Sequence, residues 1–275
     1  MSLKNMYSNS LAIAVLAVLL LGSCQSGNKS ASSESAADTL NKDTIAQVVK
    51  EVVYPLPTPF EMTQMLENIG AKYIATSLNP VDKADKYFTE KDKAVNLGVY
   101  GADLAYAATY NQKQQTELDL KAIKTLVDQL GITVDYSSLL SDQFKDKMNN
   151  KDSLIKVVTD TFYSTYQYLN EKSNPDLAVM MVSGMWVELM YLASHISKDT
   201  YSNTDIVKII FEQKESLTKL TDLLGTRNSN SDIKDLQNKL LVLKGVYDNV
   251  QTSLTKAELN TIITTIETVR ASFVK

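Results

Sequence analysis

This sequence has little of the chemistry on which enzymes most often rely. It contains one cysteine, Cys24, and one histidine, His195, in 275 residues. A single cysteine near the N-terminus excludes an intrachain disulfide, thiol catalysis and a cysteine metal site in the folded part. His195 has no second histidine and no His-x-x-Glu pairing to support zinc, haem or a triad, and a histidine favoured by a helix C-terminal dipole is the simpler interpretation. We therefore expect no metal and no cofactor.

Arginine is nearly absent as well. Arg227 and Arg270 are the only arginines among 28 basic residues, and the formal net charge is −4. Recognition of nucleic acid usually needs a basic stripe or a cluster of guanidinium groups on the phosphates. Nucleic acid is therefore not an expected partner.

Residues that break helices are also scarce. The chain has 9 glycines and 5 prolines, while 44% of its residues are hydrophobic. Such a composition favours long helices and allows a sizeable core, in one large domain or two small ones. The predicted fold class is all-α, a helical bundle or helical repeat.

The first 23 residues have the pattern of a signal peptide. Lys4 is followed by a short apolar run at 11–21 and then by Leu21-Gly22-Ser23-Cys24. This boundary resembles the lipobox of bacterial lipoproteins, and the resemblance implies cleavage before Cys24 and acylation of that cysteine. The alternative is an ordinary secretory signal or a membrane anchor with an incidental cysteine, although the apolar run is shorter than the ~20 residues that a spanning helix needs.

Residues 24–53 are expected to be the lipidated cysteine and a flexible tether, because they contain few large apolar side chains until shortly before the folded body. Gln25, rather than an aspartate, follows the cysteine, and by resemblance to sorting in Gram-negative bacteria this implies delivery to the outer membrane. No acidic run of the kind that resembles a surface-export signal follows. The expected location is therefore the periplasmic face of the outer membrane.

The folded body is predicted to span 54–275. Thr58, Pro59 and Glu61 form an N-cap, a first-turn proline and a capping-box acid, which predict a helix from 58 to about 76. Further helices are predicted at about 89–110, 112–130, 137–148, 152–171, from 175, and at 204–224, 231–252 and 256–274. Gly131 is predicted to be a left-handed cap, and Gly225 is predicted to close the helix at 204–224.

The helix at 89–110 is apolar on nearly every side and is therefore expected to be central. Small residues at 98, 101, 105 and 108 would let a neighbouring helix approach closely. Leucine at Gly98 or Gly101 is expected to be destabilising there, whereas alanine is expected to be tolerated.

Three sequence echoes predict an internal duplication. Asp103-Leu104-x-Tyr106-x-Ala108 is repeated as Glu188-Leu189-x-Tyr191-x-Ala193, and segments 126–131 and 154–159 are echoed in the same order at 220–225 and 259–264. The prediction is two similar four-helix units, 89–171 and 175–275, whose core helices lie side by side.

The candidate ligand or buried polar site consists of Asp103, Tyr106, Glu188 and Tyr191. Each carboxylate lies on a predicted buried face with a tyrosine three residues later. One interpretation is a buried charge satisfied by tyrosine hydroxyls or by a helix N-terminus. The other is a general acid whose pKa is raised by burial, with Glu188 beside Trp186 the better candidate. Its position in the middle of an apolar helix argues against an open catalytic cleft.

Segments 54–61 and 96–106, behind the lipobox, resemble those of uncharacterised helical lipoproteins of the Bacteroidota. The resemblance implies an envelope location and a helical fold, and no activity. The expected function is a non-enzymatic cell-envelope lipoprotein that is attached to the membrane by its lipid and binds or scaffolds another envelope component, such as a protein, through its helical surface. The alternative is a lipoprotein that binds a small molecule or a glycan in a pocket between the two helical units.

Overall fold

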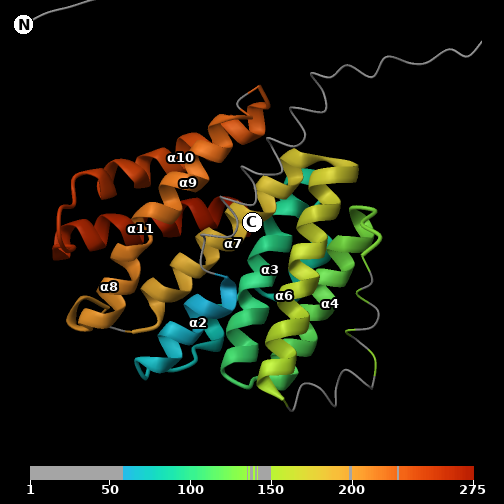
Figure 1. Cartoon of the computed structure of the whole chain (residues 1–275), viewed down its shortest axis with the longest axis horizontal. Coiled ribbons are helices and arrows are strands. Elements are labelled where there is room, and N and C mark those ends of the chain that lie inside the picture. Colours follow the sequence, from blue (N-terminus) through green and yellow to red (C-terminus); the bar gives the residue numbers. More distant parts are fainter. Residues whose placement is uncertain are drawn as a thin grey trace, which may run out of the picture. The chain divides into compact units, whose positions relative to one another are not determined.

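The structure is a computed structural model that describes residues 58–275 except 135, 137, 138, 140, 142–149, 198, 199 and 228, and the side chains of 172 and 173. Every regular element in these residues is helical (Figure 1). The nine α-helices are α2 (Pro59–Asn68), α3 (Glu90–Thr109), α4 (Lys113–Gln129), α6 (Lys151–Tyr168), α7 (Pro175–His195), α8 (Thr204–Glu212), α9 (Lys214–Gly225), α10 (Ser231–Asp248) and α11 (Lys256–Phe273). Four short segments join them: η1 (Ala75–Ser77), η2 (Val81–Lys86), the π-turn η4 (Leu169–Ser173) and η5 (Thr200–Ser202).

The all-α prediction is confirmed. All described residues belong to one compact unit, and the division into two similar four-helix units stays a prediction. The predicted signal peptide, Cys24, the tether and most of the helix predicted at 137–148 lie outside the described residues.

Helix starts follow the capping signals in the sequence. The Thr58 hydroxyl accepts a hydrogen bond from the Glu61 amide at 3.2 Å, and the Glu61 carboxylate accepts one from the Thr58 amide at 2.6 Å. This is the predicted capping box, which satisfies two amides that the helix itself leaves free. Thr89 caps α3 in the same way by accepting from the Asp92 amide at 3.0 Å.

Helix ends were harder to predict. The helix expected at 58–76 stops at Asn68, because Gly70 adopts a left-handed φ of 77° and the Ala71 amide donates back to the Leu66 carbonyl at 3.1 Å. Gly70 is therefore a C-terminal cap and not an interior glycine. Gly131, with φ 66°, is the cap that was predicted for α4.

The helix predicted at 204–224 is two helices. α8 ends at Gln213, whose buried side-chain amide donates to the Ile209 carbonyl at 3.3 Å, and α9 begins at Lys214. α8 packs on α7, whereas α9 packs mainly on α10. The break lets each helix bury its apolar face against a different neighbour. Gly225 is the last residue of α9, as predicted, and its φ is not left-handed.

α3 and α7 form the centre of the molecule and lie side by side (Figure 1). Almost all of their side chains are buried. A Cβ atom on Gly98 would overlap the Met181 carbonyl oxygen, and one on Gly184 would overlap the Val95 carbonyl oxygen. The two backbones are therefore in direct contact. α7 is long and apolar enough to cross a bilayer, but nearly all of it is buried in this core.

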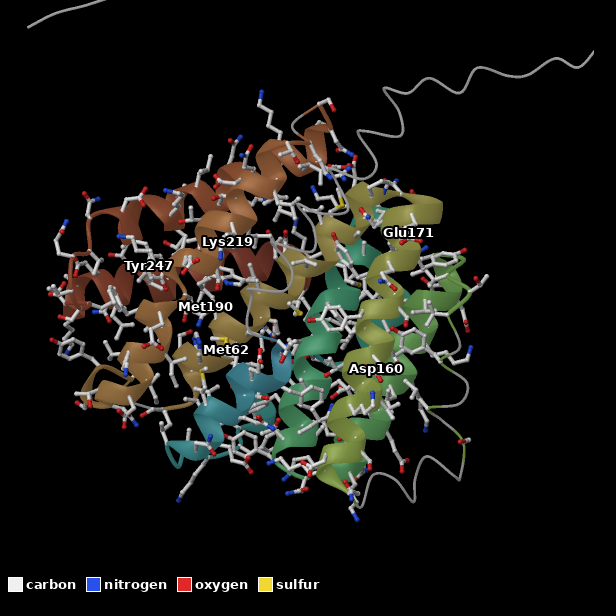
Figure 2. All side chains as sticks on the ribbon, viewed as in Figure 1. Met62, Asp160, Glu171, Met190, Lys219 and Tyr247 are labelled. Carbon is white, nitrogen blue, oxygen red and sulfur yellow. The ribbon has the colours of Figure 1, made fainter. Side chains whose placement is uncertain are left out.

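The remaining helices cover this pair. α2, α4 and α6 pack on α3, and α8, α9 and α11 pack on α7, with α10 against α9 and α11. Figure 2 shows Met62 of α2 and Met190 of α7 in the interior, where both are fully buried. The end of α11 is attached to α3 by a hydrogen bond from the side-chain Nδ2 of Asn96 to the Phe273 carbonyl at 2.8 Å.

Candidate functional site

The central helix pair brings Asp103 and Glu188 together. Gly98 lies against Met181 and Met185, and five residues further along α3 the carboxyl group of Asp103 lies beside that of Glu188 on α7. The two helices therefore run in the same direction. Both carboxyl groups have no exposure to solvent.

Arg270 of α11 is the partner of Glu188. Its Nε donates to Glu188 Oε2 at 2.6 Å and its Nη2 donates to Oε1 at 2.7 Å, which is a bidentate pair. The same Nη2 donates to the Ser77 carbonyl at 3.0 Å. The guanidinium carbon also lies 3.9 Å from the centre of the Tyr191 ring, in a cation–π contact. α11, α7 and the segment around η1 are thereby fastened together.

Asp103 is held differently. The Asn79 amide donates to its Oδ2 at 2.9 Å, while Oδ1 has no hydrogen-bond donor among the described residues. Burial raises the pKa of Asp103 well above its ordinary value, and the negative charges of Glu188 and Asp119 raise it further. A protonated Asp103 would donate through Oδ1 to Glu188 and so satisfy both groups. The pair then holds one proton and one negative charge, and Arg270 neutralises that charge.

Burial also raises the pKa of Glu188, but the charge and the two hydrogen bonds of Arg270 oppose this rise. Asp103 has no such cation of its own, since its main partner is a neutral amide. We therefore place the proton on Asp103 and the negative charge on Glu188.

The two tyrosines of the candidate set do not bind these carboxylates. The Tyr106 hydroxyl accepts from the Ile74 amide at 2.9 Å and donates to the Lys72 carbonyl at 3.3 Å. Tyr191 offers Arg270 its ring face rather than its hydroxyl. The expectation that tyrosine hydroxyls satisfy the buried charges is therefore wrong, and an arginine and a backbone amide do so instead.

Sequence reasoning missed Arg270. It follows Val269 directly and lies one helical turn after Ile266, so it lies at the edge of the buried stripe of α11. An arginine beside a buried stripe, in a chain with only two arginines, predicts a buried carboxylate partner. The position of Arg270 beside the buried stripe could therefore have identified it from the sequence.

Asp119 of α4 is a third buried carboxyl group that was not singled out. It has no solvent exposure, and Gln115 Nε2 donates to its Oδ1 at 2.8 Å. Burial raises the pKa of Asp119 to about 8, and its Oδ2 has no partner within the described part of the chain. At neutral pH this side chain is therefore largely protonated.

His195 is the last residue of α7, at the predicted helix C-terminus. Its Nδ1 lies 2.8 Å from the Tyr191 carbonyl and its Nε2 lies 2.9 Å from Glu267 Oε1. The imidazole ring also stacks on Tyr191, with 4.0 Å between ring centres. Among the described residues, no three histidine, cysteine, aspartate or glutamate side chains come together as a metal site.

Four hollows among the described residues have no lining contribution from Asp103 or Glu188, and two of them bear on ligand binding. An apolar pocket of about 40 Å³ lies among α2, α3, α6 and α7, lined by residues such as Phe60, Gly101, Phe162 and Met185. An open cleft of about 330 Å³ is lined by Tyr201, Thr204, Val207, Lys208, Phe211, Thr252, Ser253 and Leu254. We call this second hollow the Tyr201 cleft. Its volume lies within the range of about 300–1,000 Å³ that is usual for ligand sites, whereas the apolar pocket is far smaller.

The chain matches no protein-family model, no curated protein and no solved structure. The fold and the site define an all-α protein built on a central helix pair with a buried carboxyl–arginine cluster.

Proposed function

We propose that this protein is a non-enzymatic, lipid-anchored protein of the cell envelope that binds or scaffolds another envelope component through its helical surface. One observation carries the proposal. Asp103 and Glu188, the best candidates for acid–base chemistry, have no solvent exposure, and Arg270 occupies Glu188 on both oxygens. A general acid has to come within hydrogen-bonding distance of its substrate, and these groups cannot do so while α3, α7 and α11 stay packed.

The anchor is part of the same proposal. The run at 11–21 and the Leu21-Gly22-Ser23-Cys24 boundary support acylation of Cys24, and Gln25 supports the outer membrane, at its periplasmic face. A flexible tether of residues 24–53 would hold the helical body on the order of 30 Å from the membrane. A protein placed in this way meets its partners with the surface of its helices.

Some apolar side chains on that surface are available for a partner. Phe88, directly before the N-cap of α3, is 84% exposed, and Val242 on α10 is 63% exposed next to the half-exposed Leu241. Covering apolar surface contributes roughly 25 cal/mol per Å². Such residues support binding through the helical surface.

The test is crosslinking in cells, followed by mass spectrometry of the full-length acylated protein. We expect lysines of the helical body, such as Lys86 near Phe88, to crosslink reproducibly to one envelope protein. Phe88→Ser should weaken these crosslinks if the partner covers that side chain. Lys156→Ser, at an exposed position of α6, is the matched surface control. Crosslinks no stronger than those of an unrelated lipoprotein would contradict a binding or scaffolding role.

The non-enzymatic part of the proposal has its own test. Purified protein should release no fragments from peptidoglycan, and Glu188→Gln should behave like wild type in the same assay. Cleavage that depends on Glu188 would show that the buried pair opens to a substrate and would reverse the proposal.

A second candidate function is a lipoprotein that binds a small molecule or a glycan. The observation that favours it is the Tyr201 cleft, which has the volume of a ligand site. Its lining comes from 201–254, within the second of the two predicted units. Two pockets do lie between helices of both predicted units: the apolar one of about 40 Å³ and a more polar one of about 130 Å³ beside Lys91 and Asp235. Both are smaller than the usual ligand site.

A further inference from the structure

We propose that the Tyr201 cleft is a saccharide-binding site that favours sugars with a carboxylate. This inference rests on the second candidate function and names its ligand class. The shape of the cleft, its aromatic side chains, its hydroxyl-bearing residues and Lys208 support this ligand class.

The cleft is formed by three segments that meet at one end of the second half of the chain. η5 contributes Tyr201, α8 contributes one of its sides, and the connection between α10 and α11 contributes Thr252, Ser253 and Leu254. Two contacts hold the connection between α10 and α11 against the helical body. Lys214 Nζ donates to the Val250 carbonyl at 3.1 Å, and the Leu254 side chain is buried. The hollow is therefore present without any ligand.

The apolar part of the lining suits the face of a sugar ring. Tyr201 is 41% exposed, whereas Phe211 and Val207 are partly buried and Leu254 is buried. A pyranose presents C–H groups on its faces, and aromatic rings bind such faces by stacking. A long acyl chain would need a deeper and drier cavity than this open cleft.

The polar part of the lining suits the rim of the same ring. Tyr201, Thr204, Thr252 and Ser253 line the cleft and each carries a hydroxyl group, which makes no hydrogen bond with another described residue. A hydroxyl group both donates and accepts, as sugar hydroxyls do, so each can pair with a sugar in either sense. Most other exposed threonines bond their own helix instead, as Thr261 and Thr268 do.

The charge of Lys208 in the lining narrows the class of sugar that the cleft would favour. Lys208 is the one charged residue among the described residues that line the cleft, and its ammonium group lies 3.8 Å from Glu212 Oε1, which is a loose pair. Among the described residues, no carboxylate lines the cleft, and Lys208 disfavours a cationic ligand there. A carboxylated sugar would find Lys208, and a charge-assisted hydrogen bond is stronger than a neutral one.

The test is saturation-transfer NMR on the full-length acylated protein in a detergent without a sugar headgroup. The probes are glucose, N-acetylglucosamine and glucuronate. We expect transfer to the ring C–H protons, with glucuronate binding most tightly at low salt. Tyr201→Ala should weaken binding about fivefold or more, as expected for the loss of an aromatic contact. Lys208→Gln should remove the preference for glucuronate over glucose and leave glucose binding unchanged.

Two matched variants control this experiment. Phe88→Ala removes an exposed aromatic ring that does not line the cleft, and it should bind the sugars like wild type. Thr204→Val keeps the side-chain shape in the cleft while removing one hydroxyl, and it should weaken binding of all three sugars. The inference is overturned if no probe shows transfer at tens of millimolar, or if Tyr201→Ala and Thr204→Val both bind like wild type. Either result leaves the crosslinking test of the first proposed function unaffected, so the two failures are distinguishable.

Discussion

Arg270 is the residue that makes a charged Glu188 tolerable in the core. Removing a charge from water costs several kcal/mol unless it is paired and hydrogen-bonded, and the guanidinium group supplies two hydrogen bonds together with the opposite charge. At the scale of single residues, the predictions concern this pair and the neighbouring buried acids.

Arg270→Met should lower the free energy of unfolding by about 3–5 kcal/mol, because it leaves Glu188 buried without its cation. Urea unfolding at pH 7, followed by circular dichroism, measures the effect. The double variant Arg270→Met with Glu188→Met should recover most of the loss, since an apolar pair needs no compensation. A loss below about 1 kcal/mol in the single variant would show that the pair stabilises little.

The buried acids predict a stability that falls as the pH rises. The pKa of Asp119 is raised to about 8 in the folded protein, against about 3.9 in an unfolded chain. Between these values the folded state binds more protons than the unfolded state, so the free energy of unfolding decreases by up to about 1.4 kcal/mol per pH unit. Asp103 acts in the same direction, because burial raises its pKa as well.

Asp119→Asn should therefore flatten the decline in unfolding free energy between pH 5 and pH 8. Urea unfolding at each pH unit measures it, and the gain over wild type should be largest at pH 8. Asp160→Asn, at an exposed position on α6 (Figure 2), is the control that should keep the wild-type slope. Equal slopes in wild type and Asp119→Asn would contradict a protonated, buried Asp119.

At the scale of elements, the contact between α3 and α7 depends on two glycines. The overlap at Gly98 is with the Met181 backbone, and a Cβ there would also lie 2.7 Å from the Met185 nitrogen. A Cβ on Gly101 would meet only the Phe162 ring, at an ordinary distance of 3.6 Å. The two small residues that look alike in the sequence therefore lie in different environments, and the expected tolerance of alanine at Gly98 is wrong.

Gly98→Ala and Gly184→Ala should each destabilise the protein by at least the ~1–3 kcal/mol typical of overpacking, because backbone cannot move aside as a side chain can. Gly101→Ala should change stability by less than about 1 kcal/mol, with a gain from helix propensity. Thermal unfolding of the three variants under the same conditions measures their order of stability. If Gly98→Ala melted together with Gly101→Ala, the two helices would not be in backbone contact.

At the scale of the whole molecule, the prediction concerns where the helical body is held. Cys24→Ala should leave an unprocessed precursor or a protein released from the outer membrane, because the acylated cysteine is the proposed anchor. Fractionation of cells expressing wild type and variant, with the precursor band followed on a gel, measures this. Ser23→Ala keeps a small residue before the cysteine and should still be processed. Unchanged membrane fractionation and band position in Cys24→Ala would contradict the anchor.

Local signals predicted the helices and most of their starts. Thr58, Thr89 and Asn174 cap their helices through contacts within three residues, so the pattern in the chain is enough to find them. The end of α2 at Gly70 and the break at Gln213 were missed, because each depends on which neighbour the next segment packs against. The burial of Asp103 and Glu188 was predicted, but their partners were not.

The sequence by itself determined the all-α class, the central place of α3 and α7 and the candidate carboxyl residues, because hydrophobic periodicity and capping act over a few residues. Only the tertiary structure decided that Arg270, 82 residues after Glu188, reaches it, that Gly98 contacts backbone while Gly101 contacts a ring, and that segments 201–211 and 252–254 meet in a cleft. These contacts join residues far apart in the chain. Their pairing depends on how whole helices pack, and no local pattern records it.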